Sequence, residues 1–452
     1  MPEPIHTNRR SFLRTATAAS SALALPLWWR RAHGDDLAND RLTLGAIGTS
    51  VSGDRYAGQG EQPGRGMTIA LQAATLGDTV AVADVNLYHG HFFADQLGKP
   101  IEVHQDYRRL LDRQDIDAVT IGTPDQWHTK IAIDAMRSGK HVYCEKPLTL
   151  TVDEGKQLLK VAEETGRVFQ VGTQQRSEYD RNFLKAIVIA RSGRLGEKLH
   201  ALVSVGTGQA GGPFEKSAPP AELDWEMWLG QAPDVPFCTQ RCNFDFRWWL
   251  EYSGGQVTDW GVHHMDIALW ALGLENTGPV SIEGTGNYPD VPNGYNAAVD
   301  FDCNLTFADG QVCRLYSGEN ELIITGDLGR IRINRGGLTG KPIEELTAED
   351  EDWINEEILK LCHGKDPSGE IGSNEKAGAH MHNFFECMQD GGRTVSDPWT
   401  HHRSVSACHL ANIAMRLDRR LEFDPEQEDF ISDAEASGML RRDQRPEYSI
   451  YS

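Results

Sequence analysis

The sequence predicts an α/β protein with two domains that contain different kinds of sheet. Between residues 42 and 172, short and almost wholly apolar segments alternate with segments of helical periodicity, a pattern typical of a parallel sheet covered by helices on both faces. After about residue 195 the apolar segments are longer and follow one another through turns. The sequence therefore predicts an α/β domain at 40–172 and an α+β domain at 173–452, whose large sheet is mostly antiparallel and open-faced.

The first domain is expected to contain five strands with a helix in each connection between them. Its strands are expected at 42–48, 79–84, 118–123, 141–145 and 168–173. Its helices are expected at 65–77, 87–98, 127–139 and 151–166. The strand segments carry few charges, as strands buried on both faces do.

The second domain is expected to be built mainly from strands and hairpins. Its strands are expected at 198–206, 280–288, 297–316 and 321–334, and its two helices at 257–273 and 401–420. The segment 297–316 predicts a hairpin that turns at Asp309-Gly310. In that register Cys313 lies opposite Thr306 and not opposite Cys303, so these two cysteines are not expected to pair.

Cysteine usage and charge exclude several classes of protein. The eight cysteines form no CxxC pair, so we expect mostly free, buried thiols and no zinc or iron–sulfur site. The formal charge of −22 makes nucleic acid or anionic lipid an unfavourable partner, because both would repel the chain. Acidic runs such as 344–357 are interpreted as solvated surface.

The first 34 residues predict an export signal. Arg9-Arg10 precede Phe12-Leu13 and an apolar run, which is shorter than the roughly 20 residues that span a bilayer. The stretch NRRSFLR resembles the twin-arginine export consensus. We therefore expect residues 1–34 to be removed, and the mature protein to be periplasmic and to lack a membrane span.

A glycine-containing loop after the first strand resembles part of a dinucleotide-binding fingerprint. Glycines allow the backbone to approach a pyrophosphate at the N-terminus of the next helix. Gly48 precedes Thr49 and Ser50, and Gly64, Arg65 and Gly66 open the helix. Ser50 replaces the second glycine, so this pattern alone is also compatible with an ordinary glycine-rich loop. The insertion at 50–63 is expected to form a lid over the pyrophosphate or to carry an oligomer contact.

An acidic residue at the end of the next strand indicates which cofactor is bound. A carboxylate at Asp84 would accept hydrogen bonds from the adenosine ribose hydroxyls and would disfavour a 2′-phosphate. The sequence therefore predicts NAD, with NADP less favoured.

The tripeptide Glu145-Lys146-Pro147 ends another strand of the parallel sheet, where open α/β sheets bind ligands. Together with the glycine loop, Asp84, TPDQWH (123–128) and GGQVTDWGVHHMD (254–266), it resembles the Gfo/Idh/MocA family of glucose-fructose oxidoreductases and inositol dehydrogenases. The resemblance covers nearly the whole mature chain. It implies an N-terminal Rossmann dinucleotide-binding domain, a C-terminal substrate and oligomerisation domain, and assembly as a homodimer or homotetramer.

The resemblance also implies three catalytic residues. Lys146 would reach the nicotinamide and the reacting hydroxyl, and His263 would accept the hydroxyl proton while Asp259 orients it. Asp259 and His263 are spaced i, i+4, so on a helix their side chains share a face. Without the resemblance, Asp259 could equally be a helix N-cap and the histidines a helix surface.

Further contacts are expected around these residues. Cofactor contacts are expected from Gly48, Thr49, Ser50, Gly64, Arg65, Gly66, Asp84, Thr123, Pro124, Asp125, Trp127, His128, Glu145, Lys146 and Gln175. Substrate contacts are expected from Arg176, Asp245, Arg247, Trp248 and His264. Aromatic residues cluster at 223–230 and 244–252; most are explained by a core, and those near Asp245 and Arg247 could also stack on a sugar.

Three functions are compatible with these observations. The leading hypothesis is an oxidoreductase that transfers a hydride from a carbinol carbon of a sugar, glycoside or cyclic polyol to a tightly bound, internally recycled NAD. An alternative is an NAD-dependent glycosidase or lyase that oxidises the sugar transiently. A non-catalytic sugar-binding protein is the second alternative. The sequence does not indicate which sugar or which hydroxyl reacts.

Overall fold

The computed structural model describes residues 41–52, 62–365 and 377–451. From Thr43 onward the chain forms one compact unit. The proposed export signal at 1–34 and most of the 50–63 insertion lie outside the described residues, although Val51–Ser52 (β2) pairs with Gln62–Pro63 (β3) at the base of that insertion.

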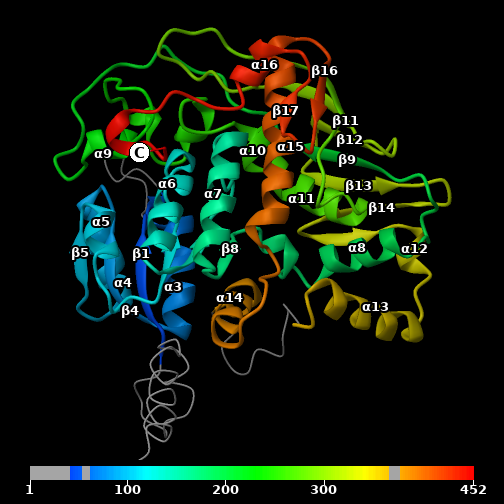
Figure 1. The fold of residues 1–452 in the computed structure, drawn as a ribbon, viewed down its shortest axis with the longest axis horizontal. Helices are drawn as coiled ribbons and strands as arrows, with labels where there is room; N and C mark the ends of the chain where they lie inside the picture. Colours follow the sequence, from blue (N-terminus) through cyan, green and yellow to red (C-terminus); the bar gives the residue numbers. More distant parts are fainter. Residues whose placement is uncertain (1–40, 53–61, 366–376, 452) are drawn as a thin grey trace, which may run out of the picture. The chain divides into compact units, whose positions relative to one another are not determined.

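A parallel sheet forms the centre of the first half of the chain, as predicted (Figure 1). It has six strands, one more than expected. Its order is β5-β4-β1-β6-β7-β8, so the order reverses beside β1, which is where open α/β sheets bind ligands. The strands are β1 (Thr43–Ile47), β4 (Asp78–Ala83), β5 (Glu102–His104), β6 (Ala118–Ile121), β7 (His141–Cys144) and β8 (Phe169–Val171). The sequence does not predict β5, because this three-residue edge strand has no buried residue.

Helices cover both faces of this sheet, which explains its continuous apolar strands. They are α3 (Arg65–Leu76), α4 (Leu87–Leu97), α5 (Tyr107–Leu111), α6 (Asp125–Arg137) and α7 (Val152–Thr165). Ala46 and Val82 pack in one core with α3 and α4. Their neighbours Ile47 and Ala81 pack in another core with α5, α6 and α7. Because successive strand residues point to opposite faces, both faces require apolar side chains.

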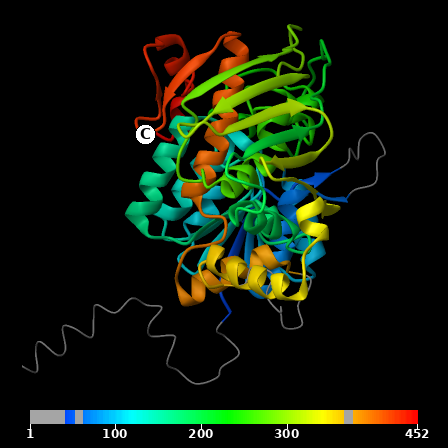
Figure 2. The same cartoon turned by 90° about the vertical axis from the view of Figure 1, so that its right-hand side faces the viewer.

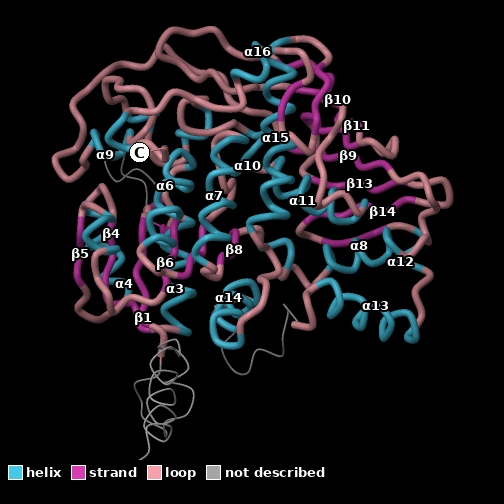
Figure 3. Tube along the Cα trace, viewed as in Figure 1, coloured by secondary structure: helices cyan, strands magenta, loops and turns pink. Residues whose placement is uncertain are grey.

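A nine-stranded sheet forms the centre of the second half of the chain (Figure 3). Its order is β15-β14-β13-β9-β12-β11-β10-β16-β17, and only the β9–β12 pair is parallel among its described pairs. The strands are β9 (His200–Val205), β10 (Ser281–Gly286), β11 (Phe301–Thr306), β12 (Val312–Ser317), β13 (Glu321–Thr325), β14 (Arg330–Asn334), β15 (Gly337–Thr339), β16 (Leu421–Asp424) and β17 (Asp429–Phe430). The predicted mostly antiparallel sheet is confirmed.

Only one face of this sheet is fully buried. In β11, Phe301, Cys303 and Leu305 are buried, whereas Asp302 and Asn304 on the other face are partly or fully exposed. The sheet presents that second face toward the viewer in Figure 2. The sheet is therefore open-faced, as the sequence predicts.

The 297–316 hairpin differs from the prediction by one position. Cys313 lies opposite Leu305 rather than Thr306, and Cys303 lies opposite Leu315. The turn takes residues 307–311, with Gly310 at a φ of +86° that favours glycine, and this wider loop moves the register. The two cysteines are still not opposite each other, and all eight cysteines are free thiols.

Most helices of the second half share one core with the large sheet, whereas α9 (Trp225–Leu229) and α14 (Ala379–Asp390) pack against the first domain. The helices of this half are α8 (Asn182–Arg191), α9 (Trp225–Leu229), α10 (Gln256–Asp259), α11 (Gly261–Leu272), α12 (Lys341–Glu344), α13 (Ala348–Leu361), α14 (Ala379–Asp390), α15 (Pro398–Leu417) and α16 (Ala434–Gly438). None of the described helices is long and apolar enough to cross a membrane.

One helical prediction needs correction, and the predicted acidic surface forms part of a helix. The predicted helix at 257–273 is interrupted at Trp260, and every residue of α11 is buried. The acidic run at 344–357 lies mostly in α13, which begins with a capping box between Thr347 and Asp350 and buries Ile354 and Ile358. Only one side of that helix is therefore solvated surface.

Candidate active site

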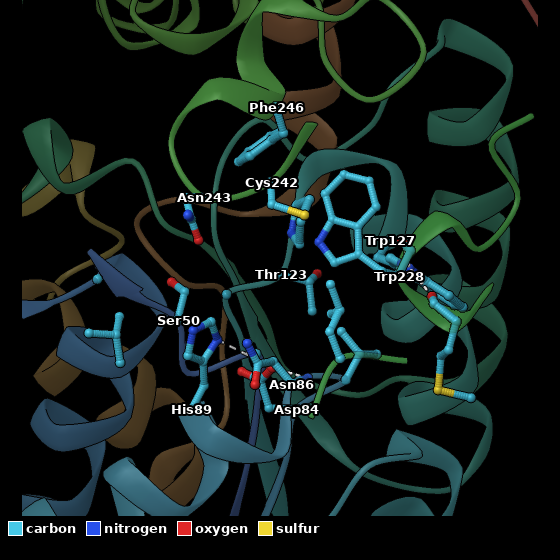
Figure 4. Close-up of a pocket in the computed structure, with 18 of the residues that line it drawn as sticks. Ser50, Asp84, Asn86, His89, Thr123, Trp127, Trp228, Cys242, Asn243 and Phe246 are labelled. Atoms are coloured by element: carbon cyan, nitrogen blue, oxygen red, sulfur yellow. Dashed lines mark hydrogen bonds and ion pairs between the residues drawn. The ribbon is translucent and has the colours of Figure 1, made fainter. Parts of the chain in front are cut away.

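A cavity of about 800 Å³ lies at the carboxyl ends of the parallel strands (Figure 4). One wall comes from the loops that follow β1, β4, β6 and β7, and the other from residues 217–247 of the second half of the chain. Most of the residues predicted to contact a cofactor line it: Gly48, Ser50, Gly64, Arg65, Asp84, Thr123, Pro124, Asp125, Trp127, His128, Glu145 and Lys146.

The turn between β1 and α3 leaves room for a phosphate group. Gly48 has a φ of +74°, and its N–H donates to Ala83 O at 2.9 Å. A Cβ at Gly66 would lie 2.0 Å from Gly48 O, so only glycine fits there. No side chain caps the N-terminus of α3. Because uncapped N–H groups at a helix N-terminus bind anions, this turn fits a dinucleotide pyrophosphate.

Asp84 is held rigidly at the end of β4. The N–H of Thr49 donates to Asp84 Oδ2 at 2.8 Å, and the N–H of Asn86 donates to Asp84 Oδ1 at 2.9 Å. His89 Nδ1 lies 3.6 Å from Asp84 Oδ1. Figure 4 shows the side chains of Asp84, Asn86 and His89 close together in the cavity. A carboxylate has about four acceptor sites, so Asp84 can still accept from ribose hydroxyls.

The residues that follow β6 connect neighbouring loops as well as lining the cavity. His128 Nδ1 lies 2.7 Å from Pro147 O and its Nε2 lies 2.9 Å from Thr123 O. Ser253 Oγ donates to Asp125 Oδ2 at 2.5 Å, and burial raises the pKa of Asp125. His128 therefore holds the turn at Thr123 against the turn that contains Lys146.

Lys146, Asp259 and Arg247 meet at the end of the cavity. Lys146 Nζ donates to Asp259 Oδ1 at 2.6 Å and to Asp259 O at 2.9 Å. Arg247 Nε lies 3.2 Å from Asp259 Oδ2. Burial would raise the pKa of Asp259, but the two cations hold it well below its usual value. Asp259 is therefore a carboxylate that fixes the position of the Lys146 amine.

The structure corrects the partner of His263. The sequence predicts that Asp259 orients this histidine, but both Asp259 oxygens face cations. Arg335 Nη2 instead donates to His263 Nε2 at 3.3 Å, and His263 Nδ1 is buried without a partner among the described residues. Burial, reinforced by Lys146 and Arg335, holds the pKa of His263 well below its usual value. His263 is therefore a neutral imidazole that carries its hydrogen on Nδ1, so it can accept a proton only on Nε2, the nitrogen to which Arg335 donates.

Arg335 is a site residue that the sequence does not reveal. It follows β14, 72 positions after His263, and its guanidinium lies over the rings of Trp260 and Tyr179 at 4.5 and 4.9 Å. No motif marks it, because an arginine after a strand is usually a solvated residue. The run of aromatic contacts that holds it exists only in the folded chain.

Glu145 lines the cavity next to the lysine, whereas Gln175 lies in the turn Gln174–Arg176 after β8 and is not among the residues that line the cavity. Glu145 Oε1 accepts from Arg65 Nε at 2.8 Å and from Gln174 Nε2 at 2.9 Å. Both polar atoms of the Gln175 side chain are buried without a hydrogen-bond partner in the described part of the chain. An unpaired buried amide costs roughly 1–3 kcal/mol, and the predicted cofactor contact of Gln175 stays a prediction.

Two predicted substrate residues lie away from the cavity. Arg176 is 2% exposed and forms two hydrogen bonds with Asp266, Nε to Oδ2 at 2.6 Å and Nη2 to Oδ1 at 2.7 Å. His264 Nε2 lies 2.7 Å from Asn320 Oδ1. We expect both side chains to stabilise the fold rather than to contact substrate.

The other three predicted substrate residues come from one turn, Asp245–Trp248. Asp245 and Arg247 line the cavity, whereas Trp248 is buried behind it. The Arg247 guanidinium lies over the rings of Phe244 and Phe246, at 4.3 and 4.8 Å. Asn243 also lines the cavity. Aromatic rings beside polar side chains form a surface suited to a sugar.

Known protein families match both halves of the chain. The domain described as "Oxidoreductase family, NAD-binding Rossmann fold" (GFO_IDH_MocA) matches residues 42–173. The domain described as "Oxidoreductase family, C-terminal alpha/beta domain" matches residues 189–332 and 369–450. The prediction of NAD as the cofactor is confirmed by the first of these matches.

Curated relatives match part of the chain. A glycosyl hydrolase family 109 protein of Shewanella putrefaciens is 32% identical over 209 residues, which are 43% of this chain and 44% of that protein. An alpha-N-acetylgalactosaminidase of Shewanella oneidensis is 45% identical over 94 residues, 21% of this chain and 20% of that protein. The matches thus span less than half the length of these relatives.

Solved structures show the same fold. The WlbA dehydrogenase of Chromobacterium violaceum, in complex with NADH and UDP-GlcNAcA, has a TM-score of 0.60 at 16% identity, covering 86% of this chain and 97% of its own. An aldose-aldose oxidoreductase of Caulobacter crescentus has a TM-score of 0.57 at 17% identity, covering 85% of this chain and 100% of its own. The chain therefore belongs to the Gfo/Idh/MocA oxidoreductase family, with an NAD-binding Rossmann domain followed by the family's C-terminal α/β domain.

Proposed function

We propose that this protein is an NAD-dependent oxidoreductase that acts on a sugar, glycoside or cyclic polyol and keeps its cofactor between turnovers. The observation that carries the proposal is the meeting of Lys146 with the Asp259 carboxylate, 2.6 Å apart, at the end of the cofactor cavity. When bound, NAD would accept the hydride that leaves the carbinol carbon. The residues of the chain have to bind the hydroxyl and remove its proton.

The three polar groups divide this work. Asp259 stays ionised and holds the Lys146 amine, which donates a hydrogen bond to the reacting oxygen. His263 is neutral and accepts the proton as the carbonyl forms. The sugar would lie against Phe244 and Phe246, with Asp245 and Asn243 available for its other hydroxyls.

A glycosidase that oxidises its substrate transiently is the second candidate. The relatives named as glycosyl hydrolase family 109 proteins favour it, at 32% to 46% identity over parts of the chain. Oxidation of one carbinol makes the neighbouring C–H acidic, so that proton and the leaving group can be eliminated. Water then adds to the unsaturated ketone, and the hydride returns to the carbonyl carbon. That cycle needs a cofactor that stays bound and no external electron acceptor.

One experiment separates the two candidates. The purified holoprotein is incubated with free sugars, polyols and nitrophenyl glycosides, without an electron acceptor, in deuterated water. An oxidoreductase accumulates at most one equivalent of NADH and continues only after an acceptor is added. A glycosidase releases nitrophenol catalytically and incorporates solvent deuterium beside the oxidised carbon. Absence of NADH formation and of product with every substrate would contradict both.

Replacing Asp84 with alanine is expected to weaken NAD binding by about 10- to 100-fold, because a hydrogen bond to a charged acceptor contributes roughly 1.5–3 kcal/mol. NADP binding should change less, since Asp84 disfavours a 2′-phosphate. Titration of the apoprotein with each nucleotide measures both effects. Asp95→Ala, on the exposed side of α4, is the control, and equal loss of both nucleotides would argue against this role.

The low pKa of His263 predicts activity in mildly acidic solution. Burial and then the cations Lys146 and Arg335 depress this pKa, so the acidic limb of kcat/KM should lie well below pH 6.5. Arg335→Met removes one cation and should move the limb to higher pH, though not fully, because burial remains. Arg332→Met, which removes an exposed arginine of β14, is the control. An unmoved limb would contradict this assignment.

We also propose export by the twin-arginine route and assembly as a homodimer or homotetramer through the outer face of the large sheet. The partly exposed side chains of Leu202, Tyr316 and Ile323 on that face support the assembly. Light scattering at micromolar concentration measures the assembly, and a monomeric mass would reject it.

The Arg9-Arg10 pair supports the export. Replacing both arginines with lysine should leave the protein in the cytoplasm.

A further inference from the structure

A segment of the second half of the chain covers the end of the cofactor cavity that lies over β4 and β5. This covering segment, residues 217–228, contributes to the cavity wall: Ser217, Ala218, Pro219, Pro220, Leu223, Met227 and Trp228. The opposite wall at this end comes from residues 84–89 together with Gln105 and Tyr107. In Rossmann domains the adenosine lies on this side of the sheet, beside the acidic residue of the second strand. Here that residue is Asp84.

The covering segment is joined to the loop after β4 by a short antiparallel pairing. The N–H of Asp224 donates to Val85 O at 2.9 Å, and the N–H of Leu87 donates to Glu222 O at 3.0 Å. Asn86 and Leu223 lie directly opposite each other between these bonds. The pairing begins one residue after Asp84, so it closes the cavity at the point where ribose hydroxyls would bind.

Gln105, the residue that follows β5, reinforces this pairing. Its Nε2 donates to Val85 O at 3.0 Å and to Glu222 O at 3.1 Å, and thus joins both partners of the pair. One side chain therefore bridges the Rossmann domain and the covering segment.

The far end of the covering segment is fixed separately. Trp127 Nε1 donates to Met227 O and to Trp228 O, each at 3.0 Å. Arg445, near the C-terminus, donates through Nη2 to Glu226 O at 2.9 Å and through Nε to Gly230 O at 2.7 Å. With residues 222–224 and residues 226–228 both attached, this part of the segment cannot swing aside unless one attachment opens.

We propose that the covering segment is the second wall of the adenosine subsite and that its pairing with residues 85–87, braced by Gln105, retains NAD in the folded protein. This rests on the proposed function, in which the cofactor is kept between turnovers. An adenosine bound beside Asp84 is enclosed between the two halves of the chain. Its exchange requires the three hydrogen bonds that join Glu222 and Asp224 of the covering segment to Val85, Leu87 and Gln105 to break together.

The first test measures cofactor release. Full-length protein is loaded with isotope-labelled NAD and chased with an excess of unlabelled NAD. Gln105→Ala removes the hydrogen bond from Gln105 to Glu222 O in the covering segment and should release NAD about fivefold faster, since such a bond contributes roughly 1 kcal/mol. Gln114→Ala, which removes an exposed glutamine of the same domain, should release it at the wild-type rate. Equal rates in all three proteins would overturn the proposal.

The second test separates retention by the segment from a direct contact of Gln105 with adenosine. Asn86 and Leu223 form a non-hydrogen-bonded antiparallel pair, whose Cα atoms are typically about 4.5 Å apart, a distance compatible with a disulfide. In the Asn86→Cys/Leu223→Cys protein, oxidation should slow NAD release about tenfold or more relative to the same protein reduced, because the pairing can no longer open.

The outcomes distinguish this inference from the proposed function. One outcome is that oxidation leaves NAD release unchanged in a protein that still binds NAD and turns over substrate. That result overturns only the inference that the covering segment retains NAD. A protein that takes up no NAD overturns both. Slower release after oxidation supports retention by the segment even if the substrate proves to be of another class.

Discussion

Replacing Lys146 with alanine is expected to lower kcat by about 10²- to 10⁴-fold, the usual effect of losing one positioned proton-transfer group. The variant should remain folded and keep its NAD, because the phosphate turn and Asp84 lie elsewhere in the cavity. Asp259 would still be paired with Arg247, 3.2 Å away, so the buried carboxylate is not left without a cation. Single-turnover formation of NADH by the holoprotein measures the effect directly.

The matched control is Lys160→Ala. Lys160 lies in α7 with 70% of its side chain exposed, so this variant should retain wild-type turnover. His263→Ala should behave like Lys146→Ala. If the two residues act as one proton-transfer unit, the double variant should be little slower than the slower single one. Wild-type turnover in a folded Lys146→Ala protein would remove the lysine from the mechanism.

Replacing Arg176 with alanine is expected to destabilise the protein by about 3–5 kcal/mol, the usual result of removing one partner of a buried ion pair. Asp266 is fully buried, and besides Arg176 it accepts a hydrogen bond from Ser404 Oγ at 2.8 Å. The variant leaves its charge in the interior without a cation. Thermal unfolding followed by circular dichroism measures the loss.

Two comparisons test the cause of that loss. The double variant Arg176→Leu/Asp266→Leu removes both charges and should be more stable than Arg176→Ala. Arg420→Ala breaks an exposed ion pair with Glu422 and should unfold near the wild-type temperature. A double variant as unstable as the single one would mean that lost packing, including the contact of Arg176 with the Trp270 ring at 4.6 Å, dominates.

The same pair predicts a dependence of stability on pH. Burial would raise the pKa of Asp266, but Arg176 lowers it below its ordinary value. A carboxylate with a depressed folded-state pKa stabilises the fold above its unfolded-state pKa, about 3.9. Its contribution is therefore complete at neutral pH and is lost as the pH falls below about 4.

The order of strands and helices in the first domain could be predicted because it follows from the local periodicity of apolar residues. A strand buried on both faces needs a run of apolar residues, so β1, β6 and β7 are visible in the sequence. The turn at Gly48 and the carboxylate at Asp84 are visible for a similar reason, since each stands at a fixed offset from the first or second strand. The edge strand β5 has no such run and is not predicted.

The partners of the charged residues were decided by the tertiary structure. The sequence places Asp259 and His263 four residues apart, but the break at Trp260 and the position of Arg247 turn the carboxylate toward Lys146. Arg176 is 90 positions from Asp266 and Arg335 is 72 from His263. The covering segment and Gln105 are 117 positions apart where they meet. Local periodicity indicates which residues are buried. The partner of a buried charge depends on which distant segments the two sheets bring together, and only the folded chain determines which segments those are.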